Sequence, residues 1–310
     1  MSERIKVFAP ATASNLGPGF DVLGLALEQP GDLVEAEIST SPGVEIVEVT
    51  GADSLSTDPE ENVVGISAAA AIDQIGITDR GVRLWLHKQM PLGSGLGSSA
   101  ASSVGGAVAV NALFGNTLSK HDIVNCSLQG EAAASGTAHA DNVAPSVFGG
   151  IVLIRSTNPL DVVALPVPAA LRVVVVHPHT EVLTAEARRL VAERHYTIGQ
   201  AVQNLGNVAA FVTALHQSDL ALFARSISDA LVEPVRAPLV PGYATVKQAA
   251  LDAGALGCSI SGSGPSVVAF ADSDALAGDI ATAVEDGFAT HSLTSDRYVG
   301  PVNGVGAQVV

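Results

Sequence analysis

Residues 91–102 read PLGSGLGSSAAS and lie between a predicted strand at residues 81–88 and a predicted uncharged helix at residues 98–113. Glycine lets the backbone approach an anion closely and adopt positive φ angles. The free N–H groups of a first helical turn, together with the helix dipole, attract phosphate. The stretch therefore predicts a phosphate-binding loop, with the alternative that Ser98 and Ser99 only cap the helix.

Two common nucleotide-binding loops differ from this stretch. A Walker loop ends in Gly-Lys-Ser/Thr, and no lysine stands at that place. Residues 95–100 match the Gly-x-Gly-x-x-Ala form of a dinucleotide fingerprint, which also needs an acidic residue about 20 positions later at the end of a strand. Residues 115–117 offer none, and Asp122 falls at a predicted helix start. A dinucleotide-dependent oxidoreductase is therefore disfavoured.

Strand-like and helix-like segments alternate along all 310 residues, which predicts a mixed α/β protein. We expect strands at residues 4–9, 34–39, 44–49, 151–155 and 171–176, and a turn-rich loop at residues 10–19. We expect helices at residues 62–76, from Ser119, and at residues 184–194, 199–216 and 219–231. Residues 156–168 hold three prolines and no helical period. We expect them to lead from a first domain, residues 1–155, into a second, residues 156–310.

Composition limits the partners of the chain. Its formal net charge is −16, which argues against nucleic acid, because nucleic-acid binding needs a basic surface. The chain has no uninterrupted apolar run of about 18 residues, so we expect no membrane span. Residues 1–6 lack the apolar stretch of a secretory signal. Cys126 and Cys258 have no partner at metal or redox spacing, so we expect two free thiols. The expected compartment is the cytoplasm.

One carboxylate stands on an apolar helix face. In the helix predicted from Ser119, the residues Val124, Leu128 and Glu131 lie at positions i, i+4 and i+7. A carboxylate among core residues is unfavourable unless it is paired or bound to a cation. Glu131 is therefore predicted either to bind Mg²⁺ or to pair with a buried arginine.

Residues 91–102 resemble the second motif of the GHMP kinases, the superfamily of galactokinase, homoserine kinase, mevalonate kinase and phosphomevalonate kinase. Four further stretches resemble the homoserine kinase branch: residues 9–27 (APATASNLGPGFDVLGLAL), 139–150 (HADNVAPSVFGG), 233–243 (EPVRAPLVPGY) and 257–270 (GCSISGSGPSVVAF). The resemblance runs from Ile5 to about Phe270. It implies a two-domain α/β fold, with a left-handed βαβ unit in the N-terminal domain and a ferredoxin-like C-terminal domain.

The resemblance also implies a reaction. The γ-phosphoryl group of ATP would pass to the side-chain hydroxyl of L-homoserine, a step toward threonine, in an enzyme that forms a homodimer. Ser99 and Glu131 would hold Mg²⁺, and Asn62, Val63 and Lys88 would lie near adenine. The phosphates would be wrapped by Pro91, Leu92, Gly93, Ser94, Gly95, Leu96, Gly97, Ser98, Ser99, Ala100 and Ala101. We expect valine at Gly95 or Gly97 to exclude phosphate and leave the fold intact.

On the acceptor side, the resemblance implies binding by Asn15, Asp21, His139, Asp141, Asn142, Thr184, Arg188, Arg236 and Gly262. Arg188 and Arg236 can hold an α-carboxylate through paired donors, with Arg189 as the alternative to Arg188. Asp21 or Asp141 can take the ammonium group. Asn15 and Asn142 suit the reacting hydroxyl. His177 and His179 are interpreted as structural.

The catalytic base stays open. Mevalonate-kinase-like relatives place an aspartate where this chain has Asn142, and an amide cannot act as a base. Our preferred interpretation is that Asn142 orients the hydroxyl and the proton passes to phosphate or water, with Asp141 and Asp21 as alternative bases. Two rival functions are a kinase for another small alcohol, such as mevalonate or shikimate, and a GHMP-fold protein that binds a ligand without catalysis.

Overall fold

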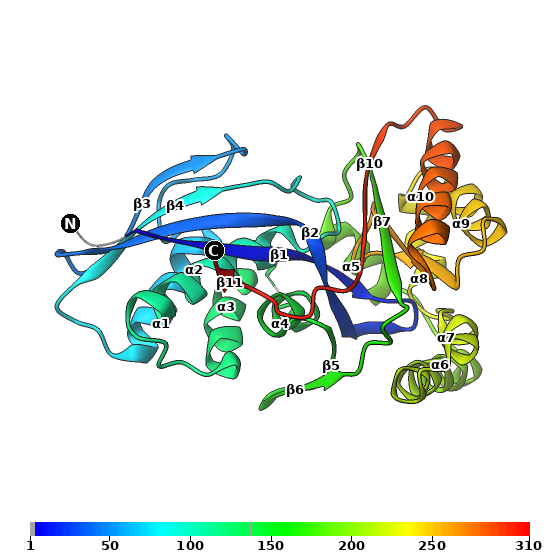
Figure 1. The fold of residues 1–310 in the computed structure, drawn as a ribbon, viewed down its shortest axis with the longest axis horizontal. Coiled ribbons are helices and arrows are strands. Elements are labelled where there is room, and N and C mark those ends of the chain that lie inside the picture. Colours follow the sequence, from blue (N-terminus) through cyan, green and yellow to red (C-terminus); the bar gives the residue numbers. More distant parts are fainter. Residues whose placement is uncertain (1–3, 137) are drawn as a thin grey trace.

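Two sheets organise the chain (Figure 1). The computed structural model describes residues 4–136 and 138–310. The first sheet has the order β11-β1-β2-β4-β3, with β5 paired to β2 and β6 paired to β5. Its strands are β1 (Ile5–Asn15), β2 (Gly19–Ser39), β3 (Gly43–Thr50), β4 (Gly81–His87), β5 (Ile151–Thr157), β6 (Leu160–Leu165) and β11 (Gln308–Val309).

The expected loop at residues 10–19 is wrong for most of its length. Strand β1 continues to Asn15, and only residues 16–18 turn before β2 begins. The turn-forming residues suggested a loop, but residues 11–14 alternate alanine with a hydroxyl residue. That alternation sends Thr12 and Ser14 to the same face of the strand.

Four helices lie on one face of the first sheet (Figure 1): α1 (Val63–Ile75), α2 (Ser98–Leu113), α3 (Lys120–Ser135) and α4 (Ala140–Phe148). Helix α1 connects β3 to the parallel neighbouring strand β4, which forms a βαβ unit. Helix α2 is buried along its length, as its lack of charge predicts. A Cβ atom on Gly105 would lie 2.6 Å from Val34 Cγ2, so the glycines of α2 allow close packing against the sheet.

The second sheet has the order β10-β7-β9-β8 and is antiparallel throughout. Its elements follow the chain order βαββαβ of a ferredoxin-like unit, as expected. They are β7 (Arg172–Pro178), α9 (Tyr243–Asp252), β8 (Gly257–Ile260), β9 (Val267–Ala271), α10 (Asp274–Ala289) and β10 (Ser295–Gly300).

Five helical elements are inserted between β7 and α9. They are α5 (Thr184–Ala192), α6 (Ile198–Gln217), α7 (Leu220–Ser226), α8 (Glu233–Arg236) and the 3₁₀ helix η1 (Ala237–Leu239). The helix expected at residues 219–231 thus ends early, at Ser226. Arg236 is the last residue of the helical turn α8.

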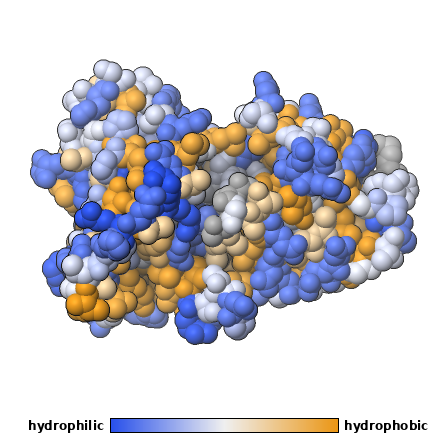
Figure 2. Space-filling model, turned by 180° about the vertical axis from the view of Figure 1, so that it is seen from behind, coloured by the Kyte–Doolittle hydropathy of each residue, from blue (hydrophilic) through white to orange (hydrophobic). Residues whose placement is uncertain are grey.

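Strand β7 separates two apolar cores. Val173 and Val175 pack with the core of the first sheet, while Val174 and Val176 pack under α9 and α10. Both faces of β7 are therefore buried, which explains its uninterrupted apolar sequence. On the reverse face of the molecule, hydrophilic and hydrophobic residues are interspersed, and the outline dips between the two halves (Figure 2).

The strand pairing bears on the domain boundary. Residues 156–168 contain β6, which forms a hairpin with β5 in the first sheet. Near the C-terminus, β11 returns to pair with β1, and Val302 bridges to Leu27. The division into residues 1–155 and 156–310 stays a prediction, although β6 and β11 pair with strands of its first part. Within residues 4–136 and 138–310, no helix is long and apolar enough to cross a membrane.

Candidate active site

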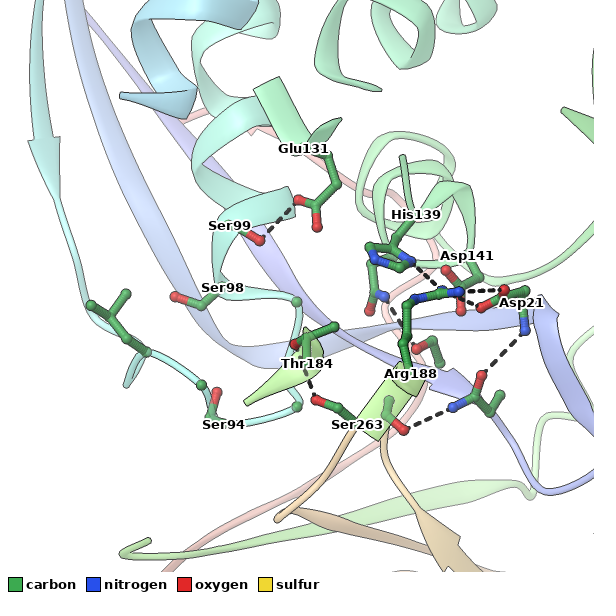
Figure 3. A pocket seen from close by; sticks show the side chains of 18 of the residues that line it. Asp21, Ser94, Ser98, Ser99, Glu131, His139, Asp141, Thr184, Arg188 and Ser263 are labelled. Atoms are coloured by element: carbon green, nitrogen blue, oxygen red, sulfur yellow. Dashed lines mark hydrogen bonds and ion pairs between the residues drawn. The ribbon is translucent and has the colours of Figure 1, made fainter. Parts of the chain in front are cut away.

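The predicted phosphate-binding loop, residues 91–101 and called the glycine loop from here on, lies between two cavities that share Leu92 and Ser99. The polar cavity, of about 150 Å³, is lined by all nine residues expected to bind the acceptor (Figure 3). The second cavity, of about 320 Å³, is lined by Asn62, Val63 and Lys88, the residues expected near adenine. The sequence-predicted site residues are therefore brought together around one loop.

Most residues of the glycine loop that are expected to wrap the phosphates line the polar cavity. Residues 92–95 and 97–99 line that cavity, whereas Leu96, Ala100 and Ala101 are buried in the core and Pro91 lines neither cavity. Gly93, Gly95 and Gly97 have φ angles of 61°, 76° and 65°. These left-handed conformations favour glycine.

The start of α2 has no side-chain cap. Gly97 stands at the N-cap position, where no side-chain hydrogen bond satisfies the first-turn N–H groups. The Ser98 hydroxyl instead contacts Lys88, and the Ser99 hydroxyl contacts Glu131. The alternative that these serines only cap the helix is therefore wrong, and the N–H groups remain available to an anion.

The glycines do not all face open space. A Cβ atom on Gly95 would collide with the carbonyl oxygen of Ser261, and one on Gly97 would collide with the Thr12 hydroxyl. The expectation that valine at these positions leaves the fold intact is therefore wrong. At Gly93 the nearest atoms to an added Cβ lie 3.7 Å away, on Glu181.

Ser99 and Glu131 meet across the start of α2 (Figure 3). The Ser99 hydroxyl donates a hydrogen bond of 2.9 Å to a Glu131 carboxylate oxygen. Burial raises the pKa of Glu131 to about 6, while the Ser99 hydrogen bond and the charge of Lys88 act in the opposite direction. The cation that acts on this pKa is thus a lysine rather than the arginine of the alternative interpretation. A hydroxyl beside a buried carboxylate is a donor set that suits Mg²⁺.

An ion pair occupies the opposite end of the polar cavity (Figure 3). Arg188, on α5, donates to both carboxylate oxygens of Asp21 at 3.1 and 2.7 Å. Arg188 also lies 2.6 Å from Nδ1 of His139, whose pKa is lowered to about 4 by burial and then by Arg188. His139 is therefore neutral, with Nδ1 as acceptor. Arg189 pairs with Glu193 on the surface, so the structure turns Arg188 rather than Arg189 to the cavity.

Arg236 approaches the same cavity from α8. It is 3% exposed, and its guanidinium donates to the carbonyl oxygen of Gly262 at 2.8 Å. Both arginines also lie over the ring of Phe20, with 5.5 Å from the ring centroid to Arg188 and 5.0 Å to Arg236. Both guanidinium groups thus make cation–π contacts with Phe20.

Asp141 and Asn142, at the start of α4, form the floor of the cavity. Burial, followed by the charge of Asp21, raises the pKa of Asp141 to about 7. The Asn142 amide accepts a hydrogen bond from the Thr12 hydroxyl at 2.9 Å and donates one to the Ser14 hydroxyl at 3.1 Å. The orientation of Asn142 is therefore fixed by strand β1.

Thr12 and Ser14 were missed by the analysis of the sequence. Their signal was the period-two alternation of residues 11–14, which the interpretation as a loop concealed. Strain also marks this region, since Asn15 and Asp21 have φ angles of 72° and 60° without being glycine. The Asn15 side chain donates to the Gly262 carbonyl at 2.9 Å and accepts from the Asp21 N–H at 3.3 Å. Its amide thereby connects the two halves of the acceptor site.

His177 lines neither cavity. Its Nδ1 atom lies 3.1 Å from the Ser266 hydroxyl, which donates to the carbonyl oxygen of Ser94 in the glycine loop. His179 contacts Asp296 and Thr294 at the surface. The histidines thus make structural contacts, as expected.

Comparison with known proteins agrees with this geometry. The GHMP kinases N terminal domain matches residues 62–150, and the GHMP kinases C terminal domain matches residues 211–290. The homoserine kinase of Chlorobium phaeobacteroides (strain BS1) is 44% identical over 98% of each chain. That of Arabidopsis thaliana is 44% identical over 99% of this chain and 84% of its own.

Solved structures give the same result. The crystal structure of homoserine kinase from Cytophaga hutchinsonii is 49% identical, with a TM-score of 0.96 over 100% of this chain and 98% of that one. Sequence relatives above 40% identity over nearly the full length, together with this match, identify the family. The chain belongs to the homoserine kinase family of the GHMP kinases.

Proposed function

We propose that this kinase transfers the γ-phosphoryl group of ATP to the side-chain hydroxyl of L-homoserine and forms O-phospho-L-homoserine, a step toward threonine. The observation that carries the proposal is the meeting of two cavities at Ser99. One is lined by Asn62 and Val63, and the other holds two arginines and two aspartates. A nucleotide that crosses the glycine loop would bring its last phosphate to the acceptor.

In this proposal the nucleotide lies along the second cavity and the loop. Adenine would contact the wall near Val63, since the Asn62 amide is already used to cap α1 through the Val64 N–H. The phosphates would accept hydrogen bonds from the uncapped N–H groups of α2. Ser99 and Glu131 would hold Mg²⁺, which neutralises charge on the phosphates when it is bound.

The acceptor would lie among the ionic groups. Within the described residues, the Nε atoms of Arg188 and Arg236 are buried without a hydrogen-bond partner. Buried donors of this kind favour an anionic ligand, because a missing hydrogen bond destabilises a buried polar group. The substrate carboxylate supplies that anion, and Asp21 and Asp141 take the ammonium group.

The reacting hydroxyl would lie against Asn142. Because Thr12 and Ser14 fix its amide, Asn142 can orient a hydroxyl without accepting its proton. The proton passes to phosphate or water, with Asp141 and Asp21 retained as alternative acceptors. A loose transition state needs little help from a base, so positioning is the main contribution of these residues.

From the family resemblance we further propose that the enzyme uses ATP with Mg²⁺ and forms a homodimer. The cytoplasm stays the compartment expected from the composition. Neither nucleic acid nor a membrane is expected as a partner.

The test is an ADP-release assay with L-homoserine, mevalonate, shikimate and galactose as acceptors, with the product identified by ³¹P NMR. We expect turnover with L-homoserine alone. L-Serine, one methylene shorter, is the matched control and should react poorly because its hydroxyl stops short of the phosphate. Faster turnover of another alcohol would contradict the acceptor. Tight ADP binding without any turnover would favour a protein that binds without catalysis.

A further inference from the structure

A buried ion pair lies beneath the glycine loop, outside the polar cavity. Lys88, directly after β4, pairs with Asp32 of β2, and the two side chains are 1% and 0% exposed. Lys88 lines the second cavity, where it is expected near adenine, but its ammonium group is directed toward Asp32 and the first turn of α2. The expected role therefore leaves the direction of this group unexplained.

The ammonium group holds the first turn of α2. It donates to the carbonyl oxygen of Ser98 at 2.9 Å, to the Ser98 hydroxyl at 2.7 Å and to the Ser102 hydroxyl at 2.9 Å. Asp32 accepts from the Ser102 hydroxyl at 2.8 Å and from the N–H of Gln89 at 3.0 Å. Two strands and one helix are thus joined at one point.

This contact holds the first turn of α2 without using its N–H groups. Helices α1 and α3 are capped by Asn62 and Ser119, whose side chains accept hydrogen bonds from first-turn N–H groups. Helix α2 begins at Gly97, which has no side chain to do so. Lys88 donates to the carbonyl and hydroxyl oxygens of the first turn of α2. The N–H groups of that turn therefore remain available for phosphate.

The charges explain why two residues are needed. A lone ammonium group near a helix N-terminus is unfavourable, because it opposes the helix dipole. Burial lowers the pKa of Lys88, and the Asp32 carboxylate counteracts this effect. Asp32 therefore favours the charged form of this buried ammonium group.

We propose that Lys88 and Asp32 form a positioning pair for the phosphate-binding end of α2, in which Lys88 fixes Ser98 and so directs the neighbouring Ser99 toward Glu131. The inference rests on the proposed function, and it assigns the pair to nucleotide binding rather than to the acceptor. Lys88 acts through Ser98, and Asp32 acts through Lys88 and Ser102, so we assign neither residue to the reacting atoms.

The experiment removes the pair without leaving a buried charge. Lys88→Met alone leaves Asp32 unpaired and should lower the Tm by roughly 5–15 °C. The double variant Lys88→Met/Asp32→Asn should recover most of that loss. Its Kd for ADP, measured by calorimetry without Mg²⁺, should nevertheless rise about tenfold, because the hydrogen bonds to Ser98 are gone. Its KM for L-homoserine should stay within about threefold of wild type.

The matched control uses the same two strands. Glu37 and Arg83 face each other on β2 and β4 at 2.8 Å, far from both cavities. Glu37→Gln/Arg83→Met removes a partly exposed ion pair between β2 and β4 and should leave the ADP affinity unchanged.

Wild-type ADP affinity in a double variant with a recovered Tm would overturn the proposal. If the double variant does not fold, Lys88→Met alone gives the comparison, because it also removes the hydrogen bonds to Ser98. An unchanged ADP affinity there would overturn the proposal equally. Wild-type turnover of L-homoserine tests the proposed function separately, because ADP binding does not depend on the acceptor.

Discussion

Asp21 and Arg188 form a two-point ion pair inside the polar cavity, at 3.1 and 2.7 Å. An amino acid that binds there brings both a carboxylate and an ammonium group. Each member of the pair can then exchange its protein partner for a substrate group, and no charge remains unpaired. A simple hydroxy acid would pair its carboxylate with Arg188, but it has no ammonium group to pair with Asp21.

The site should therefore select zwitterions. We expect 4-hydroxybutanoate, which lacks only the amino group of homoserine, to show kcat/KM lower by roughly 100-fold or more, because an unpaired carboxylate remains in the cavity. In Asp21→Ala this penalty should shrink, since the unpaired group has been removed. Steady-state kinetics with both acceptors measures the ratio. Equal ratios in wild type and variant would argue against the exchange.

Arg236 should act on the acceptor alone. Truncating one partner of a buried charge pair typically costs about 2–5 kcal/mol, so Arg236→Ala should lower kcat/KM for homoserine roughly 30-fold to more than 1,000-fold. The KM for ATP should change little. Lysine should recover only part of the loss, because it cannot supply two parallel donors.

Homoserine lactone is the matched ligand for that comparison, since it lacks a free carboxylate. Its binding, measured by calorimetry, should be nearly equal in Arg236→Ala and wild type. A variant that weakens ATP and homoserine alike would show that Arg236 supports the fold rather than the acceptor.

Glu131 should set the metal requirement. Glu131→Gln keeps the shape of the side chain and removes its charge, so the Mg²⁺ concentration for half-maximal activity should rise about tenfold and kcat should fall roughly 100-fold. Chelation of the metal should abolish activity in both proteins. Glu193→Gln, on the surface, is the control. An unchanged Mg²⁺ dependence in Glu131→Gln would remove this residue from the metal site.

Asp141 should give the enzyme opposite pH dependences of activity and stability. Its pKa is raised to about 7, so the ionised form that takes the substrate ammonium group appears as the pH rises, and kcat/KM for homoserine should increase up to about pH 7. A raised pKa also means that the folded state binds this proton more tightly than the unfolded state. The stability that this proton contributes is complete at acid pH, below the pKa of the unfolded chain, and is lost as the pH rises through 7.

The variant that separates these effects is Asp141→Asn. Its Tm relative to wild type should rise between pH 5 and pH 8, while its activity with homoserine falls at every pH. Thermal unfolding over this range checks the sign. A Tm difference independent of pH would show that Asp141 does not titrate there.

The glycines of the loop should differ in what they tolerate. Gly95→Ala should lower the Tm and weaken both substrates, because the added Cβ displaces the turn that carries Gly262. The Cβ added by Gly93→Ala makes only ordinary contacts, so this change should destabilise the fold by only about 1–2 kcal/mol, from its positive φ angle. Gly278→Ala, in α10 with free space around it, is the control. Equal effects at Gly93 and Gly95 would contradict the packing described here.

Local signals predicted much of this fold. The helical pattern of residues 62–76, the helix start expected at Ser119 and the uncharged run at residues 98–113 placed the starts of three helices within a residue or two. The i, i+4, i+7 position of Glu131 predicted a carboxylate among core residues, and Glu131 is 5% exposed. Each of these features depends on neighbours within a few turns of chain, so a pattern can report it.

Long-range relationships could not be predicted in the same way. The sequence left Arg188 and Arg189 as alternatives, since adjacent helical residues point in different directions and only the packing of α5 decides between them. Asp21 meets Arg188 across 167 positions, and Asp32 meets Lys88 across 56. No periodicity links such pairs. The handedness of the βαβ unit and the acceptor roles came from the family resemblance.

The return of β11 to β1 constrains how the two halves move. The second sheet is joined to the first both where β6 leads into β7 and where the chain leaves β10 to bridge Val302 with Leu27. The packing of Val173 and Val175 in the core of the first sheet adds to these two connections. Because Arg188 and Arg236 come from one side of the cavity and Asp141 from the other, we expect any shift between the sheets to change the spacing of the carboxylate and ammonium sites together.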